Sequence, residues 1–270
     1  MPTKTDLQAT VANVGSFIRQ SVTRPVEDRI FFVHLPKCGG KSIDKAIRRV
    51  VRAVPGRRRG RIVSLDEPAT TRAADAMGVS VWDVRDHLQA FYLSQDDVHY
   101  LRGHFQVRED LMERYAGEFA FVTVMREPVK RWISHYFFNR YKKDDHFRIE
   151  IGLEEFVETE RARDLGQMYL RYFSGTGQVE GSVGEDKDVR DRARRNLERF
   201  ELVGFLGELD DFRAKFEKRF GADLTTFKRN KNPAPKAALR EELTPELRAR
   251  IEELCEPDIE LYEHARARYA

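Results

Sequence analysis

Two short stretches of the chain combine cationic side chains with the start of a helix, an arrangement that binds anions. Pro36-Lys-Cys-Gly-Gly-Lys-Ser42 follows an apolar run and precedes a helical pattern. Glycines at such a junction let backbone N–H groups approach a phosphate-like ligand closely. Arg126 follows a second apolar run and precedes Pro128, a residue typical of the first turn of a helix. Its guanidinium could therefore bind a second phosphate in a bidentate manner.

A histidine is the first candidate for a general base. His104 stands in Leu101-Arg-Gly-His-Phe105, at the end of a predicted strand and on the same sheet edge as the glycine loop. Asp66 and Glu67 follow another predicted strand, where acidic residues are common at helix starts for structural reasons. His34 lies inside a predicted strand, so we expect it to pack beneath the loop.

Apolar runs and helical periodicity define the elements that must position these residues. Strands are predicted at Arg29–Leu35, Ile62–Leu65, Val98–Phe105, Phe119–Met125 and Leu202–Leu206. Helices are predicted at Ser42–Val54, Pro68–Leu93, from Pro128 onward, Leu153–Arg163, Leu165–Phe173, Asp188–Phe200, Leu209–Phe220 and from Thr244 onward. This alternation predicts an α/β class, a three-layer P-loop-like fold with a mainly parallel central sheet of about five strands flanked by helices.

The composition suits one folded domain. The chain has 270 residues, of which 41% are hydrophobic, enough to bury a large core. We expect a single domain over residues 1–270, with an N-terminal helical extension at 1–24 and an exposed loop at 175–187, where glycines and charges gather. Lys and Arg number 48 against 45 for Asp and Glu, so the net charge is +3. A dedicated nucleic-acid-binding protein would normally be more basic.

The cysteine count and the N-terminus bear on the compartment. Cys38 and Cys255 are too few for a disulfide scaffold, which favours a reducing environment. The sequence has neither a signal-peptide pattern nor an apolar run long enough to span a bilayer. We therefore predict a cytoplasmic location and no membrane span. Because no His, Cys or carboxylate group shows metal-ligand spacing, we also predict no metal.

One interpretation of the glycine loop is an ATP site. Gly40-Lys-Ser42 matches the end of the P-loop pattern GxxxxGK[ST], but Leu35 stands where that pattern begins with glycine. Ile62–Glu67 superficially resembles a magnesium-binding strand end, without independent support. An ATP-dependent kinase in which Lys41 is essential is therefore an alternative.

A more specific interpretation comes from a resemblance to the sulfotransferase family. Phe31-Phe-Val-His-Leu-Pro-Lys-Cys-Gly-Gly-Lys-Ser42 resembles the FxHxPKxGGxS loop that binds the 5′-phosphosulfate of the donor PAPS (3′-phosphoadenosine 5′-phosphosulfate). Phe121–Tyr136 resembles the second signature, R-[DE]-P-hydrophobic-x-R-x-x-S-x-Y, which holds the 3′-phosphate. The GHF context of His104 resembles the uronosyl 2-O-sulfotransferase branch, in which this histidine deprotonates the sugar hydroxyl. Other branches of the family use a glutamate base after the first βα unit, which makes Asp66 and Glu67 the alternative bases that the resemblance implies.

The resemblance implies a PAPS-dependent O-sulfotransferase whose partner is a hydroxyl-bearing acceptor, a glycan or glycoconjugate. It implies catalytic roles for Lys37, which would stabilise the departing phosphate, and for His104 as the base. The donor-binding residues that it implies are Lys37, Cys38, Gly39, Gly40, Lys41, Ser42, Arg126 and Ser134. Cys38 departs from the family pattern, which usually has Thr or another small residue there, and Lys41 replaces a common Thr.

Two basic segments have less specific roles. Lys228, Arg229 and Lys231 could close over the 3′-phosphate, although charge runs are usually solvated. The turn Arg57–Arg61 could attract an anionic acceptor. A non-enzymatic module that binds polyanions or nucleic acid through this turn is a second alternative, and it predicts steep salt dependence without turnover.

Overall fold

The computed structural model describes residues 26–52, 60–143, 147–177, 179, 181–224 and 242–270. Three features of the sequence analysis lie outside these residues: the predicted helical extension at 1–24, the basic turn from Arg57 to Arg59, and the late basic residues Lys228, Arg229 and Lys231. Within the described residues, no helix is both long and apolar enough to cross a membrane.

A five-stranded sheet forms the centre of the molecule. Its strands are β1 (Arg29–Val33), β2 (Arg61–Ser64), β3 (Val98–Gly103), β4 (Phe119–Met125) and β5 (Leu202–Phe205). Their order in the sheet is β2-β3-β1-β4-β5, and every neighbouring pair is parallel. All seven residues of β4 are buried, as expected for an inner strand of a parallel sheet that is covered on both faces. The predicted fold class is therefore confirmed.

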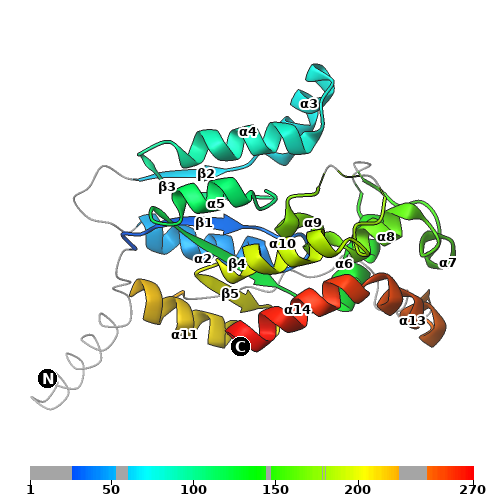
Figure 1. The fold of residues 1–270 in the computed structure, drawn as a ribbon. Helices are drawn as coiled ribbons and strands as arrows, with labels where there is room; N and C mark the ends of the chain where they lie inside the picture. Colours follow the sequence, from blue (N-terminus) through cyan, green and yellow to red (C-terminus); the bar gives the residue numbers. More distant parts are fainter. Residues whose placement is uncertain (1–25, 53–59, 144–146, 178, 180, 225–241) are drawn as a thin grey trace, which may run out of the picture.

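Helices cover both faces of the sheet (Figure 1). One face packs against α2 (Gly40–Arg52) and α11 (Leu209–Phe220). The opposite face packs against α4 (Val81–Leu93), α5 (Glu109–Tyr115), α9 (Met168–Ser174), α10 (Lys187–Glu198) and α14 (Glu256–Tyr269). Beyond one end of the sheet, a third apolar cluster joins α6 (Pro128–Tyr141), α7 (Leu153–Phe156), α8 (Glu160–Gly166) and α13 (Pro245–Leu254).

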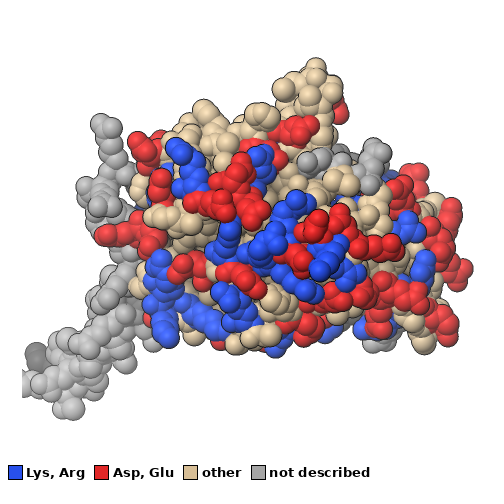
Figure 2. Space-filling model, in the orientation of Figure 1, with Lys and Arg blue, Asp and Glu red and all other residues tan. Residues whose placement is uncertain are grey.

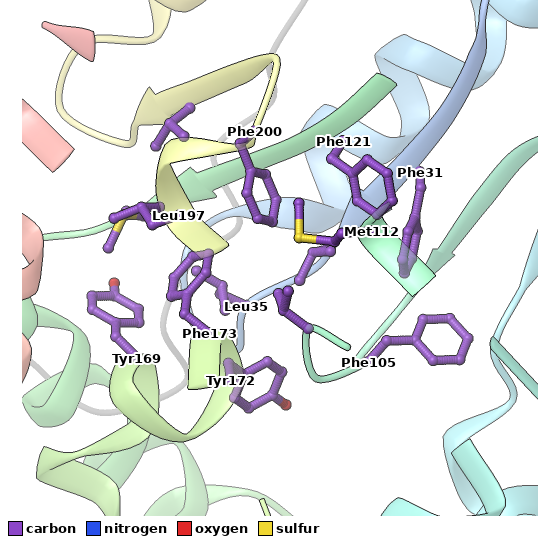
Figure 3. Packing of buried hydrophobic residues seen from close by; sticks show 14 of the residues in the cluster. Phe31, Leu35, Phe105, Met112, Phe121, Tyr169, Tyr172, Phe173, Leu197 and Phe200 are labelled. Atoms are coloured by element: carbon purple, nitrogen blue, oxygen red, sulfur yellow. The ribbon is translucent and has the colours of Figure 1, made fainter. Parts of the chain in front are cut away.

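The alternation of side chains along the strands divides the core between the two faces. In β1, Phe31 faces the cluster that contains α9 and α10, whereas Ile30 and Phe32 face α2. The Phe31 ring packs edge-on between Phe105 and Phe121, with both centroid distances at 5.5 Å. Figure 3 shows this aromatic packing beside the residues of α9. The strand that leads into the glycine loop is therefore fixed from both sides.

Two predicted helices are each split into two. The stretch Pro68–Leu93 is divided into α3 (Glu67–Met77) and α4, because Gly78 adopts a left-handed conformation at φ 65° and Ser80 begins α4 with a capping box. The closing helix from Thr244 is divided at Cys255 into α13 and α14, and α14 has a proline in its first turn.

The described residues between Gly175 and Asp186 form a loop that is not exposed throughout, and Lys187 begins α10. Thr176 and Val183 are 6% and 2% exposed. The backbone N–H groups of Val183 and Gly184 donate to Gln167 Oε1 at 2.8 and 3.1 Å. The predicted exposed loop is therefore buried at these residues, because a side chain from the end of α8 supplies the hydrogen-bond acceptor that the loop backbone requires.

Candidate functional site

The carboxyl ends of β1, β3 and β4 bring the three predicted motifs together. Val33 of β1 pairs with Gly103 of β3 on one side and with Thr123 of β4 on the other. The glycine loop follows β1, His104 follows β3 and Arg126 follows β4. In the sheet, β3 and β2 lie on one side of β1, and β4 and β5 lie on the other side. The loop thus lies where the strand order changes direction, the usual ligand position in such sheets.

The glycine loop is sharply bent and packs on a buried histidine. Lys37 and Gly39 both adopt left-handed backbone conformations, at φ 65° and φ 77°. A Cβ on Gly40 would lie 1.9 Å from His34 Cδ2, so only glycine fits between the loop and that ring. His34 is 5% exposed, which confirms that it packs beneath the loop. Helix α2 begins at Gly40, so the positive end of its dipole adjoins the loop, an arrangement that favours phosphate binding.

Lys37 and Arg126 form the cationic part of the site. Arg126 Nη1 donates to the backbone oxygen of Lys37 at 3.4 Å. The Lys37 ammonium lies 3.6 Å from the ring centroid of Phe138 on α6, a favourable cation–π contact. Burial, together with the charges of Arg126 and Lys41, lowers the pKa of Lys37 to about 8. A bound anion would relieve the repulsion between these crowded cations.

Helix α6 presents Ser134 toward the same region. Glu127 caps this helix, because its carboxylate oxygens each accept a hydrogen bond at 2.9 Å from the N–H groups of Val129 and Lys130. Ser134 is 8% exposed, and Phe138 stands four residues later on the same helix face. Because Phe138 contacts Lys37, the face that carries Ser134 is directed toward the glycine loop.

His104 is held in one orientation and one tautomer. Its Nδ1 atom is hydrogen-bonded to the backbone oxygen of His34, so Nδ1 carries the proton and Nε2 keeps the lone pair. Nε2 lies 3.2 Å from an oxygen of Glu67, the first residue of α3. Burial lowers the pKa of His104, while the Glu67 charge opposes this shift. Nε2 is therefore the nitrogen that could accept a proton, and the adjacent Glu67 carboxylate favours the protonated ring that would result.

Arg102 and Asp44 fix the position of His34, and His34 in turn contacts His104. Arg102 Nη2 lies 2.8 Å from His34 Nδ1, and the two histidine rings stack with centroids 4.6 Å apart. Arg102 in turn lies 3.7 Å from the carboxylate of Asp44 on α2. Burial lowers the pKa of His34 well below 6.5, so His34 remains neutral and accepts the hydrogen bond from Arg102. This arrangement rigidifies the loop and the candidate base together.

One group of side chains has the composition of a metal site: His34, Glu67 and His104. Each offers one potential ligand atom, and these atoms lie within 4.8 Å of one another. The spacing of these residues in the sequence does not reveal the group. The rings of the two histidines are stacked at an interplanar angle of 28°. Metal-binding lone pairs lie in the ring plane, so stacked rings converge poorly on one ion at bonding distance. The positive charge of Arg102 beside His34 further disfavours a cation. These residues fit a proton-transfer role better than a metal site.

The remaining predicted residues fall into distinct environments. Asp66 is the N-cap of α3 and accepts from the Ala69 N–H at 2.9 Å, which is the structural alternative considered for it. Lys41 is exposed at the start of α2. Arg61, the described end of the basic turn, donates to Gln95 Oε1 at 2.8 Å. The roles predicted for individual residues in donor binding stay predictions.

Three residues that contribute to the site were missed by the sequence analysis: Phe138, Arg102 and Tyr169. Phe138 follows Ser134 by four residues, so helical periodicity could have placed it beside the motif. Arg102 precedes the Gly-His pair and could have been recognised as part of that motif. Tyr169 is a core aromatic 43 residues after Arg126, and its hydroxyl accepts from the Arg126 N–H at 2.9 Å. No local pattern in the sequence indicates this long-range contact.

Comparison with known proteins supports the resemblance. The chain is 30% identical to heparan sulfate 2-O-sulfotransferase of Caenorhabditis elegans over 109 residues, which cover 36% of this chain and 33% of that protein. The match thus spans about a third of the relative's length. The crystal structure of mouse sulfotransferase SULT7A1 complexed with PAP aligns over 91% of both chains, with 16% identity and a TM-score of 0.46. No family model matches the chain. The sequence match confirms the predicted resemblance to a carbohydrate sulfotransferase.

Proposed function

We propose that this protein is a PAPS-dependent O-sulfotransferase that transfers a sulfuryl group to a hydroxyl of a carbohydrate acceptor. The observation that carries the proposal is the meeting of two phosphate-binding motifs, with Arg126 Nη1 3.4 Å from the backbone oxygen of Lys37. PAPS bears a phosphosulfate on its 5′ oxygen and a phosphate on its 3′ oxygen. Two adjoining cationic sites complement that pair of anions.

The two ends of the site would bind different phosphate groups of the donor. The glycine loop, from Lys37 to Ser42, would hold the 5′-phosphosulfate through its backbone N–H groups and the start of α2. Arg126 and Ser134 would hold the 3′-phosphate, Arg126 through a bidentate contact and Ser134 through its hydroxyl. Cys38 contributes backbone only, because its thiol is directed into the protein toward Tyr169.

Lys37 would stabilise the phosphate oxygen that departs. As the acceptor oxygen bonds to sulfur, the bond between sulfur and the bridging oxygen breaks and negative charge develops on the 5′-phosphate. An ammonium in a partly buried site interacts with that charge more strongly than one in bulk water. Lys37 must be protonated for this role, and the phosphates of a bound donor would raise its pKa above the value of about 8.

His104 would accept the proton of the acceptor hydroxyl at Nε2. The hydrogen bond from Nδ1 to the His34 backbone oxygen keeps Nε2 unprotonated. After the transfer, the carboxylate of Glu67, 3.2 Å away, would stabilise the imidazolium. The products are a sulfate ester and 3′-phosphoadenosine 5′-phosphate (PAP), and the proton from the hydroxyl remains on His104. The match to a heparan sulfate 2-O-sulfotransferase supports a carbohydrate acceptor.

The kinase alternative is less compatible with this geometry. Asp66, the residue that would hold magnesium, caps α3 with its carboxylate. It follows β2, which is the edge strand and is separated from β1 by β3. The polyanion-binding alternative rests on the turn Arg57–Arg61, most of which lies outside the described residues. On the face shown in Figure 2, which includes α10 and α14, acidic and basic side chains are interleaved, so this face offers no broad basic surface. Arg190 and Arg194, for example, both pair with Glu260.

We also infer a reducing, cytoplasmic compartment for this protein. Cys38 and Cys255 are both free thiols, and both are buried. Burial raises the pKa of each thiol, which keeps both protonated and slow to oxidise. Fractionation of cells that express the full-length protein, followed by thiol labelling of the denatured chain, tests this inference. Recovery of the protein in a membrane or secreted fraction would contradict it.

Ligand binding and turnover test the proposed function in two steps. Thermal unfolding is measured with PAP, with ATP and magnesium, and with heparin, because a ligand that binds the native state raises the melting temperature. We expect stabilisation by PAP alone. Transfer of ³⁵S from labelled PAPS to desulfated heparan is then measured with the wild type and with Lys37→Ala. Stabilisation by ATP only, or by heparin only, would refute the proposal in favour of the corresponding alternative.

A further inference from the structure

One buried hydroxyl joins the two halves of the proposed donor site. Tyr169 Oη lies 3.3 Å from the Sγ atom of Cys38, in the middle of the glycine loop. The same oxygen accepts from the Arg126 N–H at 2.9 Å and donates to the Arg126 backbone oxygen at 2.6 Å. Tyr169 thus contacts the residue that follows Lys37 and the residue that follows β4, which are 88 positions apart in the chain.

The donor and acceptor capacities of these groups are fully matched. A tyrosine hydroxyl has one proton to donate and two lone pairs to accept with. Its proton goes to the Arg126 oxygen, one lone pair takes the Arg126 N–H, and the other can take the thiol proton of Cys38. Burial raises the pKa of Cys38, so the thiol keeps the proton that this third contact requires.

Tyr169 is itself fixed from two other elements. Its backbone N–H and that of Leu170 donate to the carboxylate of Asp258 on α14, at 2.9 and 3.0 Å. The guanidinium of Arg131 on α6 lies 5.2 Å from the Tyr169 ring centroid and 3.6 Å from Asp258. Tyr169, Arg131 and Asp258 are all fully buried. The hydroxyl is therefore held by a rigid interior and does not depend on a mobile surface helix.

We propose that Tyr169 is a positioning residue that clamps the glycine loop to the end of β4, and so sets the separation between the 5′ and 3′ phosphate sites. This inference rests on the proposed function, because it concerns how the two ends of one donor are bound together. A ligand with both phosphates gains affinity only if both sites are in register at the same time. Tyr169 supplies that register, whereas a ligand with one phosphate does not depend on it.

The test compares two tyrosines of the same helix. Tyr169→Phe keeps the ring and removes the hydroxyl with its three contacts. Tyr172→Phe is the matched control, since Tyr172 is also buried on α9 but packs edge-on against Trp82. Figure 3 shows the two hydroxyls directed to different sides. Calorimetry measures Kd for PAP, for adenosine 5′-phosphate and for adenosine 3′-phosphate with each variant, and circular dichroism records folding.

We expect Tyr169→Phe to raise the Kd for PAP about tenfold, the size of one lost hydrogen bond, and to change each monophosphate Kd by less than about twofold. Tyr172→Phe should leave all three constants unchanged. If Tyr169→Phe leaves the PAP Kd unchanged, or weakens the monophosphates as much as PAP, the clamp is refuted and the proposed function survives. If the wild type binds no PAP, both fail.

The single variant Cys38→Ala covers the case in which Tyr169→Phe folds poorly, and a double-mutant cycle tests the coupling of the two residues where both variants fold. Cys38→Ala removes the contact between the loop and the hydroxyl, and with it the 3.5 Å contact of the thiol with the Pro36 backbone oxygen, but keeps both contacts of the hydroxyl with Arg126. It should therefore reduce PAP affinity by a smaller factor with the same preference for the bisphosphate. In the Tyr169→Phe background, Cys38→Ala should have no further effect on PAP binding, because the two residues act through one contact. Additive effects of the two substitutions would overturn the proposal.

Discussion

The protonation of Lys37 gives a quantitative prediction for donor binding. Burial and the neighbouring charges of Arg126 and Lys41 lower its pKa from 10.5 to about 8 in the ligand-free protein. The ammonium form binds phosphate and the neutral amine does not, so PAP affinity should decline as the pH rises through 8. Lys37→Arg removes this titration, because a guanidinium stays charged throughout this range.

The size of the effect follows from the pKa. If only the ammonium form binds, the apparent Kd is multiplied by one plus the ratio of amine to ammonium. For a pKa of about 8, this factor is about 1.1 at pH 7 and about 11 at pH 9. The wild type should therefore lose about tenfold in PAP affinity between these pH values, and Lys37→Arg should lose less than about twofold.

Isothermal titration calorimetry at pH 7, 8 and 9, in two buffers of different ionisation enthalpy, measures both the Kd and the protons taken up on binding. Wild-type protein should take up a proton near pH 8 to 9, and Lys37→Arg should not.

Unfolding of the ligand-free protein at high pH does not explain a loss of PAP affinity. Because the pKa of Lys37 is lower in the folded state, the unfolded chain binds more protons between pH 8 and 10.5, so stability of the ligand-free protein gains from Lys37 over that range. A wild-type Kd that is constant from pH 7 to 9, or an equal pH dependence in both proteins, would refute the reasoning.

Three further substitutions test other parts of the site. His104→Ala should lower kcat by about 10²- to 10⁴-fold, as expected for loss of a general base, while the PAP Kd changes by less than about twofold; a large change in Kd would place His104 in the donor site instead. Gly40→Ala forces a Cβ against the His34 ring, so differential scanning calorimetry should show a melting temperature lower by about 2 to 10 °C. Gly117→Ala, whose Cβ meets nothing within 4 Å, is its control, and equal effects would contradict the packing argument. Arg126→Lys keeps the charge but loses the bidentate fork, so calorimetry should show PAP binding weakened about tenfold with adenosine 5′-phosphate binding unchanged; equal weakening of both would be evidence against a 3′-phosphate site.

The elements with continuous apolar runs could be predicted from the sequence because burial on both faces leaves an unbroken pattern. The strand Phe119–Met125 was predicted with its observed boundaries, and the next helix was predicted with its observed start at Pro128. The break near Gly78 was also readable, since a helix-ending glycine precedes the capping box of Ser80 and Asp83. Helical periodicity on both sides of Gly78 obscured the break, because α3 and α4 follow each other with only three residues between them.

The contacts within the site were less accessible to sequence reasoning. Motifs placed the glycine loop and His104 at one sheet edge, because parallel strands end there together. The partners of these groups come from distant parts of the chain: the Tyr169 hydroxyl contacts Cys38 across 131 positions, and Arg102 contacts His34 across 68. Such pairs depend on how helices pack on the sheet, which no local pattern specifies. Glu67 was considered only as an alternative base, whereas it lies against His104 as a partner.

A crystal structure of the protein with PAP would test the central claim most directly. The account predicts one PAP molecule with its 5′-phosphate on the loop between Lys37 and Ser42 and its 3′-phosphate in contact with Arg126 and Ser134. A PAP molecule bound elsewhere, or one that touches the loop while its 3′-phosphate points away from Arg126, would contradict it.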